Sequence, residues 1–333
     1  MKAALLKRYG GNETLEIADI ATPEIAEHEI LVQVHAASVN PLDFKIRSGK
    51  LKALLRYRMP LVLGNDLAGV VVKTGARVQR FKTGDAVYAR LDKNKIGAFA
   101  EYAAVQERDA ALKPTNTTFE EAASLPLVAL TAWQAVVEIG KIKPGQRVLI
   151  HAGSGGVGHI AIQLAHHLGA EVLTTVGKRN FEFVRSLGAD TPTDYRTERF
   201  EDIAKNCDVV LDSAGGETLV RSFKSVKPGG TVVSIGDTPS AEFAKEWGLN
   251  RILVAIIGLM ARKVSAAAKK YRAHYRYLFM RADGAQLAQI AELVQAGILK
   301  PHIDKVFSLD DIKDAMAYSE SGRATGKVVV KIN

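Results

Sequence analysis

The feature that most constrains the fold is a glycine-rich turn between a strand pattern and a helix pattern, in residues 147–169 (RVLIHAGSGGVGHIAIQLAHHLG). Val148 to His151 is apolar and predicts a short strand, and Ile160 to Leu168 places its apolar residues on one helical face. The turn has the spacing G-x-G-x-x-G, which lets a backbone without side chains approach a pyrophosphate closely at a helix N-terminus. We therefore expect a dinucleotide cofactor at this turn. The alternative is a glycine-rich corner with a purely structural role.

Length and composition are typical of a globular protein with two domains. The 333 residues are too many for one ordinary core, and 47% of them are hydrophobic. Cys207 is the only cysteine, which excludes an intrachain disulfide and a zinc site built from cysteines. The net charge of +9 suits an anionic cofactor or a membrane surface without proving either. Because a basic pair and glycines come before any apolar signal core, we expect a cytoplasmic protein.

Two patterns divide the chain. Short strand patterns dominate the first part and predict an all-β barrel or sandwich; they lie at residues 30–34, 67–73, 86–89 and 97–105. A capping-box sequence at Thr118 to Glu121 then opens a helical stretch that continues over residues 127–139. After it, strand patterns alternate with helical ones; these strands lie at residues 147–151, 171–176, 208–212 and 231–235. This alternation predicts an α/β fold class with a doubly wound parallel sheet.

The segment after Gly236 carries weaker signals. Residues 237–248 are polar and predict a mobile loop. Ile252 to Ala261 is apolar over about half the length that crosses a bilayer, so it predicts a buried or interface helix and no membrane span. The basic and aromatic segment Arg262 to Tyr277 predicts a solvated helical face, with contact to nucleic acid or anionic lipid as the alternative.

The C-terminal segment predicts helices at residues 286–295 and 310–320 and a closing strand at residues 327–332. A final strand after a doubly wound unit has no obvious place in the parallel sheet, so we assign the C-terminus to the first domain. The expected domains are therefore residues 1–119 with 272–333, which form the barrel and take the substrate, and residues 120–271, which bind the dinucleotide.

The end of the second strand of the parallel sheet predicts which dinucleotide binds. NAD selectivity usually depends on an acidic residue at this position, which accepts hydrogen bonds from the ribose 2′-OH. Here the strand runs into Gly177, Lys178 and Arg179, and two cations suit the 2′-phosphate of NADPH. The alternative is that both cations are ordinary solvated residues. Ile235 and Gly236 end a later strand of the same sheet, where we expect the nicotinamide to approach.

The chain resembles the zinc-less quinone oxidoreductase branch of the medium-chain dehydrogenase/reductase superfamily over nearly its whole length, most of all the NADPH-dependent enone (alkenal) oxidoreductases. The matching stretches are SVNPLDFK (38–45), LGNDLAGVV (63–71), residues 97–105, ASLP (123–126), residues 152–158, VKPGG (226–230) and GRATGK (322–327). The resemblance implies a GroES-like barrel joined to a Rossmann domain, with the substrate cleft between them. Many relatives are homodimers that pair through the edge of the Rossmann sheet, so we expect a homodimer.

Zinc-containing members of the superfamily carry a cysteine near position 40, a His-Glu pair near position 65 and a four-cysteine lobe near position 95. This chain has Asn40, then Asn65 and Asp66, and no cysteine in the barrel, so we expect no metal. The resemblance points to Asn40, Asp43 and Lys45 as catalytic residues facing the substrate. Asn40 would donate to a carbonyl, Lys45 would stabilise or protonate an enolate, and Asp43 would orient Lys45. The alternatives are that Asn40 is a turn residue and that Lys45 belongs to a solvated basic loop.

The expected cofactor site spans the glycine turn, the two strand ends just described and four further positions. Its residues are Thr131, Gly153, Ser154, Gly155, Gly156, Val157, Gly158, Gly177, Lys178, Arg179, Tyr195, Ser213, Ile235, Gly236 and Lys327. Tyr195 is included because it matches a tyrosine near the adenosine ribose phosphate in relatives.

The expected function is a zinc-independent, NADPH-dependent transfer of hydride to a quinone or to the activated C=C of an α,β-unsaturated carbonyl compound. The alternative is an NADPH-binding protein with a structural or RNA-associated role, although no stacking platform or RNA motif supports it and we expect no nucleic acid partner. Oxidation of simple alcohols is disfavoured because no metal ligands are visible to ionise the alcohol.

The double substitution Lys178→Glu with Arg179→Ser tests the choice of cofactor. It should weaken the binding of NADPH far more than that of NADH, because only NADPH carries the 2′-phosphate that the two cations would contact. Titration of both cofactors against the variant measures this difference. An unchanged affinity for NADPH would refute the assignment.

Overall fold

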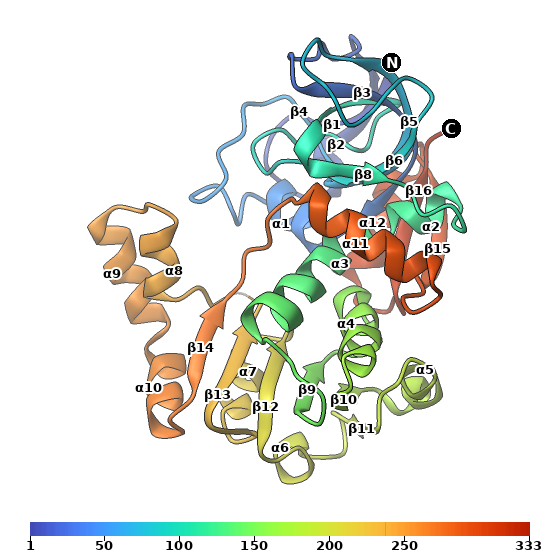
Figure 1. Ribbon diagram of the computed structural model, residues 1–333. Coiled ribbons are helices and arrows are strands. Elements are labelled where there is room, and N and C mark those ends of the chain that lie inside the picture. Colours follow the sequence, from blue (N-terminus) through green and yellow to red (C-terminus); the bar gives the residue numbers. More distant parts are fainter. Residues whose placement is uncertain (237) are drawn as a thin grey trace. The chain divides into compact units, whose positions relative to one another are not determined.

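A computed structural model of the protein describes residues 1–236 and 238–333 and divides the chain into two units (Figure 1). The first unit comprises Met1–Leu130 and Arg281–Asn333, and the second comprises Thr131–Met280. The N- and C-terminal segments therefore belong to one unit, and the second unit is inserted between them. Both boundaries lie later in the chain than the predicted ones, which followed residues 119 and 271.

The long strand β3 organises the first unit. It pairs antiparallel with β5, β7 and the C-terminal strand β16, with Val330 opposite Ala37. The resulting seven-stranded sheet has the order β15-β16-β3-β5-β6-β8, with β7 on β3. Its strands are β3 (Glu29–Val39), β5 (Asp66–Thr74), β6 (Ala86–Arg90), β7 (Tyr102–Gln106), β8 (Ala110–Leu112), β15 (Ile303–Ser308) and β16 (Lys327–Lys331). A second, three-stranded sheet contains β1 (Lys2–Leu6), β2 (Leu15–Asp19) and β4 (Leu61–Val62).

Helices of the first unit lie between these strands. They are α1 (Pro41–Arg47), α2 (Phe119–Ala123), α3 (Pro126–Trp133), α11 (Gly284–Gln295) and α12 (Ile312–Glu320), with 3₁₀ turns at Asn12–Thr14 and Glu107–Asp109. The predicted capping box is confirmed, because Thr118 Oγ1 accepts from the Glu121 amide at 3.1 Å and the Glu121 carboxylate accepts from the Thr118 amide at 2.8 Å. Helix α3 crosses the boundary between the units and continues as a π-helical segment at Gln134–Ile139.

The second unit contains a six-stranded, entirely parallel sheet with the order β11-β10-β9-β12-β13-β14. Its strands are β9 (Arg147–His151), β10 (Glu171–Val176), β11 (Thr191–Asp194), β12 (Cys207–Asp212), β13 (Val226–Ser234) and β14 (His274–Tyr277). Numbered within the unit, this order is 3-2-1-4-5-6, the doubly wound arrangement of dinucleotide-binding domains. The predicted fold class is therefore confirmed.

Helices connect the strands of this sheet. They are α4 (Gly156–His167), α5 (Phe181–Ser186), α6 (Phe200–Ile203), α7 (Gly216–Ser222), α8 (Ala241–Glu246), α9 (Arg251–Met260) and α10 (Arg262–Lys270), with a 3₁₀ turn at Lys178–Asn180. None of the helices within the described residues is long and apolar enough to cross a membrane.

Three expectations for these elements are corrected. Helix α4 begins at Gly156, inside the glycine turn, rather than at Ile160. The predicted loop at residues 237–248 contains α8, whose N-cap Ser240 accepts from the Phe243 amide at 3.0 Å; Asp237 lies outside the described residues. Strand β14 joins the parallel sheet through β13, and this pairing explains why the second unit extends beyond residue 271.

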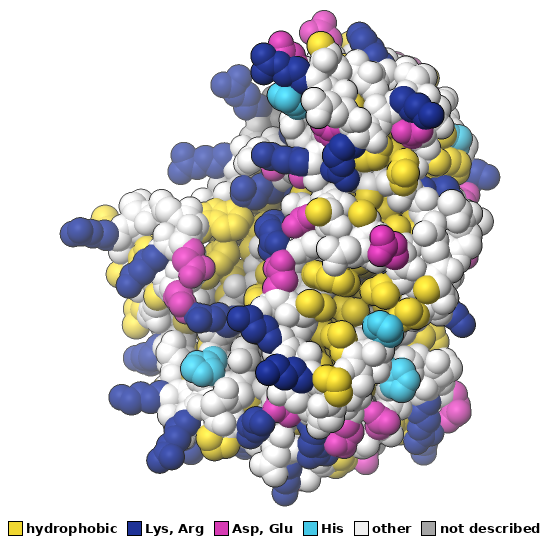
Figure 2. Space-filling view, in the orientation of Figure 1, with side chains coloured by type: hydrophobic (Ala, Val, Ile, Leu, Met, Phe, Trp, Pro, Cys, Tyr) yellow, Lys and Arg dark blue, Asp and Glu magenta, His cyan; other side chains and the backbone are white. Residues whose placement is uncertain are grey.

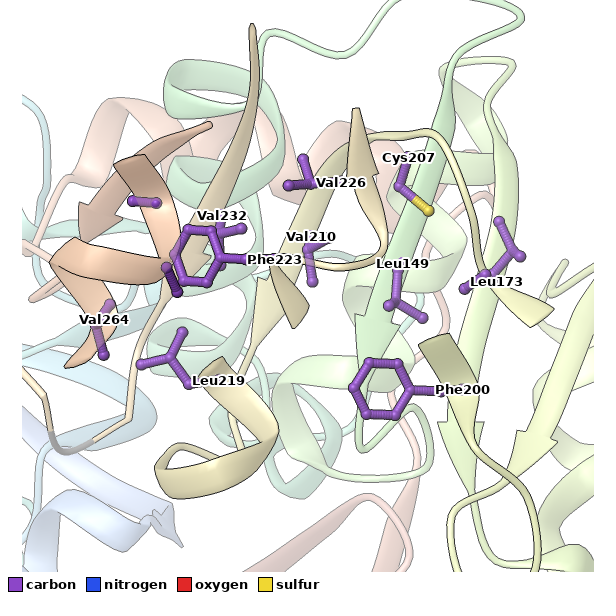
Figure 3. Close-up of a cluster of buried hydrophobic side chains, with 13 residues drawn as sticks. Leu149, Leu173, Phe200, Cys207, Val210, Leu219, Phe223, Val226, Val232 and Val264 are labelled. Atoms are coloured by element: carbon purple, nitrogen blue, oxygen red, sulfur yellow. The ribbon is translucent and has the colours of Figure 1, made fainter. Parts of the chain in front are cut away.

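One face of the parallel sheet is covered by a cluster of buried apolar side chains. Leu149, Leu173, Val210 and Val232 come from four successive strands, and Figure 3 shows them gathered with other apolar side chains of this cluster. Phe200 from α6 is 3% exposed. Burial of such apolar area is the main favourable contribution to folding, at about 25 cal/mol per Å².

Glu201 on α6 connects this helix to α7. Its carboxylate is 2.5 Å from Nη2 of Arg221 and 3.1 Å from Nη2 of Arg199. Its side chain is buried. Burial opposes ionisation of Glu201, but the hydrogen bonds from Arg221, its own backbone amide and Arg199 outweigh burial and lower its pKa to about 2. Because this pKa is below that of the unfolded chain, the carboxylate stabilises the fold above about pH 4.5, and this contribution is lost as the pH falls towards 2.

Replacing Glu201 with Gln should therefore lower the free energy of unfolding by about 2 kcal/mol at pH 7. The difference from the wild type should shrink between pH 4.5 and 2, because the wild-type carboxylate is then protonated as well. Urea unfolding at several pH values measures both effects. Glu182→Gln is the matched control, because Glu182 pairs with Arg185 on an exposed surface and should change stability by less than about 0.5 kcal/mol. Equal destabilisation by both variants would contradict this account.

Candidate functional site

The glycine turn lies between β9 and α4, and its glycines have different roles. A Cβ on Gly153 would lie 2.1 Å from Oγ1 of Thr174, and one on Gly158 would lie 2.3 Å from the carbonyl oxygen of Ala152. These two glycines are therefore required for the close approach of strand, turn and helix. A Cβ on Gly155, the N-cap of α4, would meet only the Ala152 oxygen, at 3.2 Å, among the described atoms within 4 Å. The backbone at Gly155 is thus open to a ligand at the start of α4.

The turn sits where the strand order of the parallel sheet reverses, between β9 and β12. In open α/β sheets, ligands bind at the carboxyl ends of the strands at such a point. The hydroxyl of Ser213, just after β12, donates to the carbonyl oxygen of His151 at the end of β9, at 3.1 Å. Ser213 is therefore held beside the glycine turn, at the edge where we expected the cofactor.

Hydrogen bonds also connect the ends of β12 and β13 at the same edge of the parallel sheet. The Asp212 carboxylate accepts from the Ser234 hydroxyl at 2.8 Å and from the Gly215 amide at 3.1 Å, and the Gly236 amide donates to the Ser234 hydroxyl at 3.2 Å. Burial raises the pKa of Asp212, while these hydrogen bonds oppose the shift. Ile235 and Gly236 are half-buried and lie at this edge with Gly215, whose Cα would be 3.2 Å from a Cβ on Gly236.

The end of β10 lies close to the glycine turn. Lys178 and Arg179 are exposed on the 3₁₀ turn that follows Gly177, and the next residue, Asn180, donates from Nδ2 to the Ser154 hydroxyl at 2.9 Å. This hydrogen bond connects the glycine turn to the basic turn. The structure therefore places Ser154 beside the 3₁₀ turn that carries the two cations that the sequence analysis assigned to a phosphate.

Arg196 is a third cation in this region, and the sequence analysis missed it. A Cβ on Gly177 would lie 3.6 Å from Nη1 of Arg196 and 3.9 Å from Cε1 of Tyr195. Both side chains are exposed, and the Arg196 guanidinium lies 5.3 Å from the centre of the Tyr195 ring. The sequence held one indication of it: Arg196 directly follows Tyr195, just after β11, the strand that pairs with β10.

Thr131 and Lys327 lie on elements other than these strand ends. Thr131 is 3% exposed within α3. Lys327 begins β16 in the first unit, where its ammonium donates to Oδ1 of Asn40 at 2.5 Å and to the carbonyl oxygen of Val39 at 3.1 Å. Direct contact of either residue with the cofactor stays a prediction.

The three predicted catalytic residues lie on α1, a short helix that the sequence analysis did not expect: Asn40 and Asp43 at its start and Lys45 in its last turn. Asn40 is its N-cap, Pro41 its first residue, and Asp43 Oδ2 accepts from the Asn40 amide at 2.7 Å. The other oxygen of Asp43 accepts from Nδ2 of Asn65 at 2.7 Å. Burial raises the pKa of Asp43 to about 7, against the effect of these two hydrogen bonds.

Asn40 has partners inside the first unit for both ends of its amide. Its oxygen accepts from Lys327, and its Nδ2 donates to Asp66 Oδ2 at 3.0 Å and to the Ser38 carbonyl oxygen at 3.2 Å. Asn40 and Asp43 are both 0% exposed. Their side chains therefore hold the start of α1, whereas Lys45 is half-buried and keeps access to solvent.

The resemblance aligned residues 40, 65 and 66 with zinc ligands, and in this structure an ammonium group lies among them. Burial lowers the pKa of Lys327, and the charges of Asp66 and Asp43 oppose this shift. Across from Asp66 in the β5–β6 pairing is Arg90, which is 1% exposed and which the sequence analysis also missed. Its Nε and Nη2 have no hydrogen-bond partner among the described residues. Within the described residues, no group of three or more His, Cys, Asp or Glu could hold a metal ion.

The cations at the end of α1 and in the loop after it have different roles. Arg47 is 4% exposed and donates to Asn12 and, at 2.8 Å, to Glu320, so it connects α1 to α12. The remaining cations of this loop are exposed; they are Lys50, Lys52, Arg56 and Arg58.

Comparisons with known proteins agree with this geometry. Residues 26–115 match the family described as alcohol dehydrogenase GroES-like domain, and residues 187–330 match the family described as zinc-binding dehydrogenase. The chain is 38% identical to a 2-methylene-furan-3-one reductase of Solanum lycopersicum, over 99% of this chain and 79% of that protein. It is 36% identical to the chloroplastic NADPH-dependent alkenal/one oxidoreductase of Arabidopsis thaliana, again over 99% and 79%.

Among solved structures, the quinone oxidoreductase of Coxiella burnetii is similar with a TM-score of 0.88 and 33% identity, over 100% of this chain and 99% of that one. Both kinds of comparison extend over both units. The chain therefore belongs to the medium-chain dehydrogenase/reductase superfamily and is an NAD(P)H-dependent oxidoreductase of that family.

Proposed function

We propose that the protein transfers hydride from NADPH to a quinone or to the activated C=C of an α,β-unsaturated carbonyl compound, without a zinc ion. The observation that carries this proposal is the glycine turn at the reversal of strand order, with a cluster of cations at the end of the neighbouring strand. The names of the relatives support the substrate class, because they include an alkenal/one oxidoreductase and a quinone oxidoreductase.

The cations favour NADPH over NADH. Lys178 and Arg179 follow Gly177, the Arg196 guanidinium lies against the same glycine, and no acidic side chain stands between Val176 and Asn180. A 2′-phosphate would be attracted by these charges, and a guanidinium can bind it through two hydrogen bonds. The ribose of NADH would find no carboxylate in this stretch to accept from its 2′-OH.

Bound NADPH would supply the hydride, and the chain's own groups would place the substrate and stabilise the negative charge that develops on its oxygen. We assign this task to Lys45, because it is the one predicted catalytic residue whose side chain keeps access to solvent. Asn40 and Asp43 act through the backbone, because their buried hydrogen bonds hold the first turn of α1 and hence the position of Lys45.

The buried ammonium of Lys327 supports zinc independence. Its amino group donates to Asn40, which in turn donates to Asp66, at positions where zinc-containing relatives have ligands. A divalent cation at the same place would displace these hydrogen bonds. Homodimer formation and a cytoplasmic location stay predictions.

Turnover with a substrate panel tests the proposed function. Purified protein should oxidise NADPH in the presence of enones or quinones, at an unchanged rate after treatment with a zinc chelator, and should not reduce NADP with simple alcohols. Loss of NADPH absorbance measures the rate. If the protein binds NADPH but no enone or quinone accelerates its oxidation, a non-catalytic NADPH-binding role replaces the proposed one. Loss of activity on chelation would contradict zinc independence.

Replacing Lys45 with Met tests its role. The substitution should lower kcat for an enone by about 100-fold or more, because a positioned acid typically contributes about 10²- to 10⁴-fold, and should leave the binding of NADPH nearly unchanged. Lys50→Met is the matched control, since Lys50 is an exposed cation of the same basic loop and should have little effect. A wild-type kcat in Lys45→Met would remove Lys45 from the mechanism and leave water as the proton source.

A further inference from the structure

Arg90, the last residue of β6, is a buried cation with an incomplete set of hydrogen bonds. Its side chain is 1% exposed, and its Nη1 donates to the carbonyl oxygen of Leu91. Its Nε and Nη2 have no hydrogen-bond partner among the described residues. These two nitrogens form one edge of the planar guanidinium, and such an edge can hold a carboxylate through two parallel hydrogen bonds. The edge of Arg90 that suits a carboxylate is therefore unused.

The nearest strand does not provide the missing partner. Asp66 lies opposite Arg90, but both of its oxygens are already used: Oδ1 accepts from the Leu127 amide at 3.0 Å and Oδ2 from the Ser38 hydroxyl at 2.8 Å. Burial lowers the pKa of Arg90, and the charge of Asp66 opposes this shift. A buried charged donor without a partner is costly, so its presence calls for an explanation beyond folding. A group supplied by a ligand would complete the hydrogen bonds of Arg90.

Arg90 lies close to the start of α1, the helix that carries the predicted catalytic residues. Opposite residues of an antiparallel pair point to the same face of the sheet, so Arg90 and Asp66 share a face. Asp66 accepts from Asn40, the N-cap of α1, at 3.0 Å. Burial raises the pKa of Tyr57, the charge of Arg90 lowers it and that of Asp43 raises it, so both charges lie near the Tyr57 hydroxyl. The unused edge of Arg90 therefore belongs to the same end of the first unit as α1.

The loop after α1, residues 48–60, would attract an anion to this end. Residues 44–65 contain no Asp or Glu, and the loop exposes Lys50, Lys52, Arg56 and Arg58. Figure 2 shows Lys and Arg side chains on the surface where this loop lies in Figure 1. The Tyr57 hydroxyl donates to the carbonyl oxygen of Lys93 at 2.5 Å, so the loop contacts the residues that follow β6. Because Arg90 is buried, a ligand reaches it when the side chains around it move, and we expect this movement in the loop.

We propose that Arg90 determines substrate specificity by binding a carboxylate of the substrate, so that the preferred substrates are enone acids, which carry a carboxylate apart from the reacting C=C. This proposal rests on the proposed function. The carboxylate anchors the substrate and does not react: the hydride of NADPH goes to the β-carbon, and a proton from Lys45 or water completes the saturated product. A carboxylate is favoured over a phosphate dianion, because one guanidinium would leave the second negative charge of the phosphate buried without compensation.

A matched pair of substrates tests this proposal. They are 6-oxo-4-heptenoic acid and its methyl ester, which has the same enone without the charge, and loss of NADPH absorbance measures kcat/KM for each. The wild type should prefer the acid, and raising the salt from about 50 mM to about 500 mM should lower kcat/KM for the acid alone. Arg90→Met should lower kcat/KM for the acid at least about tenfold and that for the ester less than about twofold. Arg90→Lys should fall between, because it keeps the charge and loses the two-pronged edge.

The matched control is Arg77→Met, which removes the same charge from the same unit. Arg77 is exposed and pairs with Glu27 at 3.0 Å, so this variant should keep the wild-type preference for the acid. Circular dichroism and NADPH binding establish that each variant is folded, and Arg90→Lys carries the test if Arg90→Met does not fold. The proposal is overturned if the wild type uses the ester as well as the acid, or if Arg90→Met lowers kcat/KM for both equally. It is also overturned if Arg77→Met loses the preference as much as Arg90→Met does.

A binding measurement separates this proposal from the proposed function. The saturated acid 6-oxoheptanoate cannot accept hydride at a C=C, and calorimetry should show that the NADPH-loaded wild type binds it at least about tenfold more tightly than Arg90→Met does. If neither the acid nor the ester is reduced, the proposed function is contradicted, and this binding measurement still decides the role of Arg90. Equal binding of 6-oxoheptanoate by the wild type and Arg90→Met would remove Arg90 from substrate recognition.

Discussion

The close approach of β9 and α4 is the constraint on which the second unit depends. Backbone atoms occupy the space that a side chain at Gly158 would need, so the helix can start directly behind the strand only with glycine there. The same corner lies at the reversal of strand order and leaves space beside Gly155 at the start of α4, where an added Cβ would meet only the Ala152 oxygen among the described atoms within 4 Å. A requirement of packing and a requirement of cofactor binding are thus met by one turn.

In the first unit, ionisable side chains are buried and depend on hydrogen-bond partners. Asp43, Asp66 and Lys327 lie among Asn40, Asn65 and Ser38, and their hydrogen bonds connect the start of α1 to strands β5 and β16. Burial shifts all three pKa values towards the neutral forms; the hydrogen bonds and the attraction between Lys327 and the two carboxylates oppose these shifts, whereas the charge of Asp66 adds to the shift of Asp43. Removing one partner of such a network leaves the others without compensation, which is why we treat these residues as positioning residues.

Cations gather at two places in the second unit. At the end of β10 the cations lie beside the glycine turn and suit one phosphate group. Along α9 and α10 they border exposed apolar side chains, Ile252, Ile256, Leu259 and Met260, so the predicted burial of the helix at residues 252–261 is wrong. The overall charge of +9 predicted an anionic partner of some kind, but only the folded chain shows where the individual cations lie.

Local patterns in the sequence were sufficient to predict the parallel sheet, the glycine turn and the capping box at Thr118, and to find the two cations after Gly177. Each of these features depends on residues that are neighbours in the chain. Helix α1 was missed because its start is stabilised by Asn65 and Lys327, which are distant in sequence. Arg196 approaches Gly177 through the pairing of β10 with β11, and the exposure of α9 depends on which face meets α8. Tertiary structure decided these features, since burial and long-range hydrogen bonds are properties of the folded chain and not of any one segment.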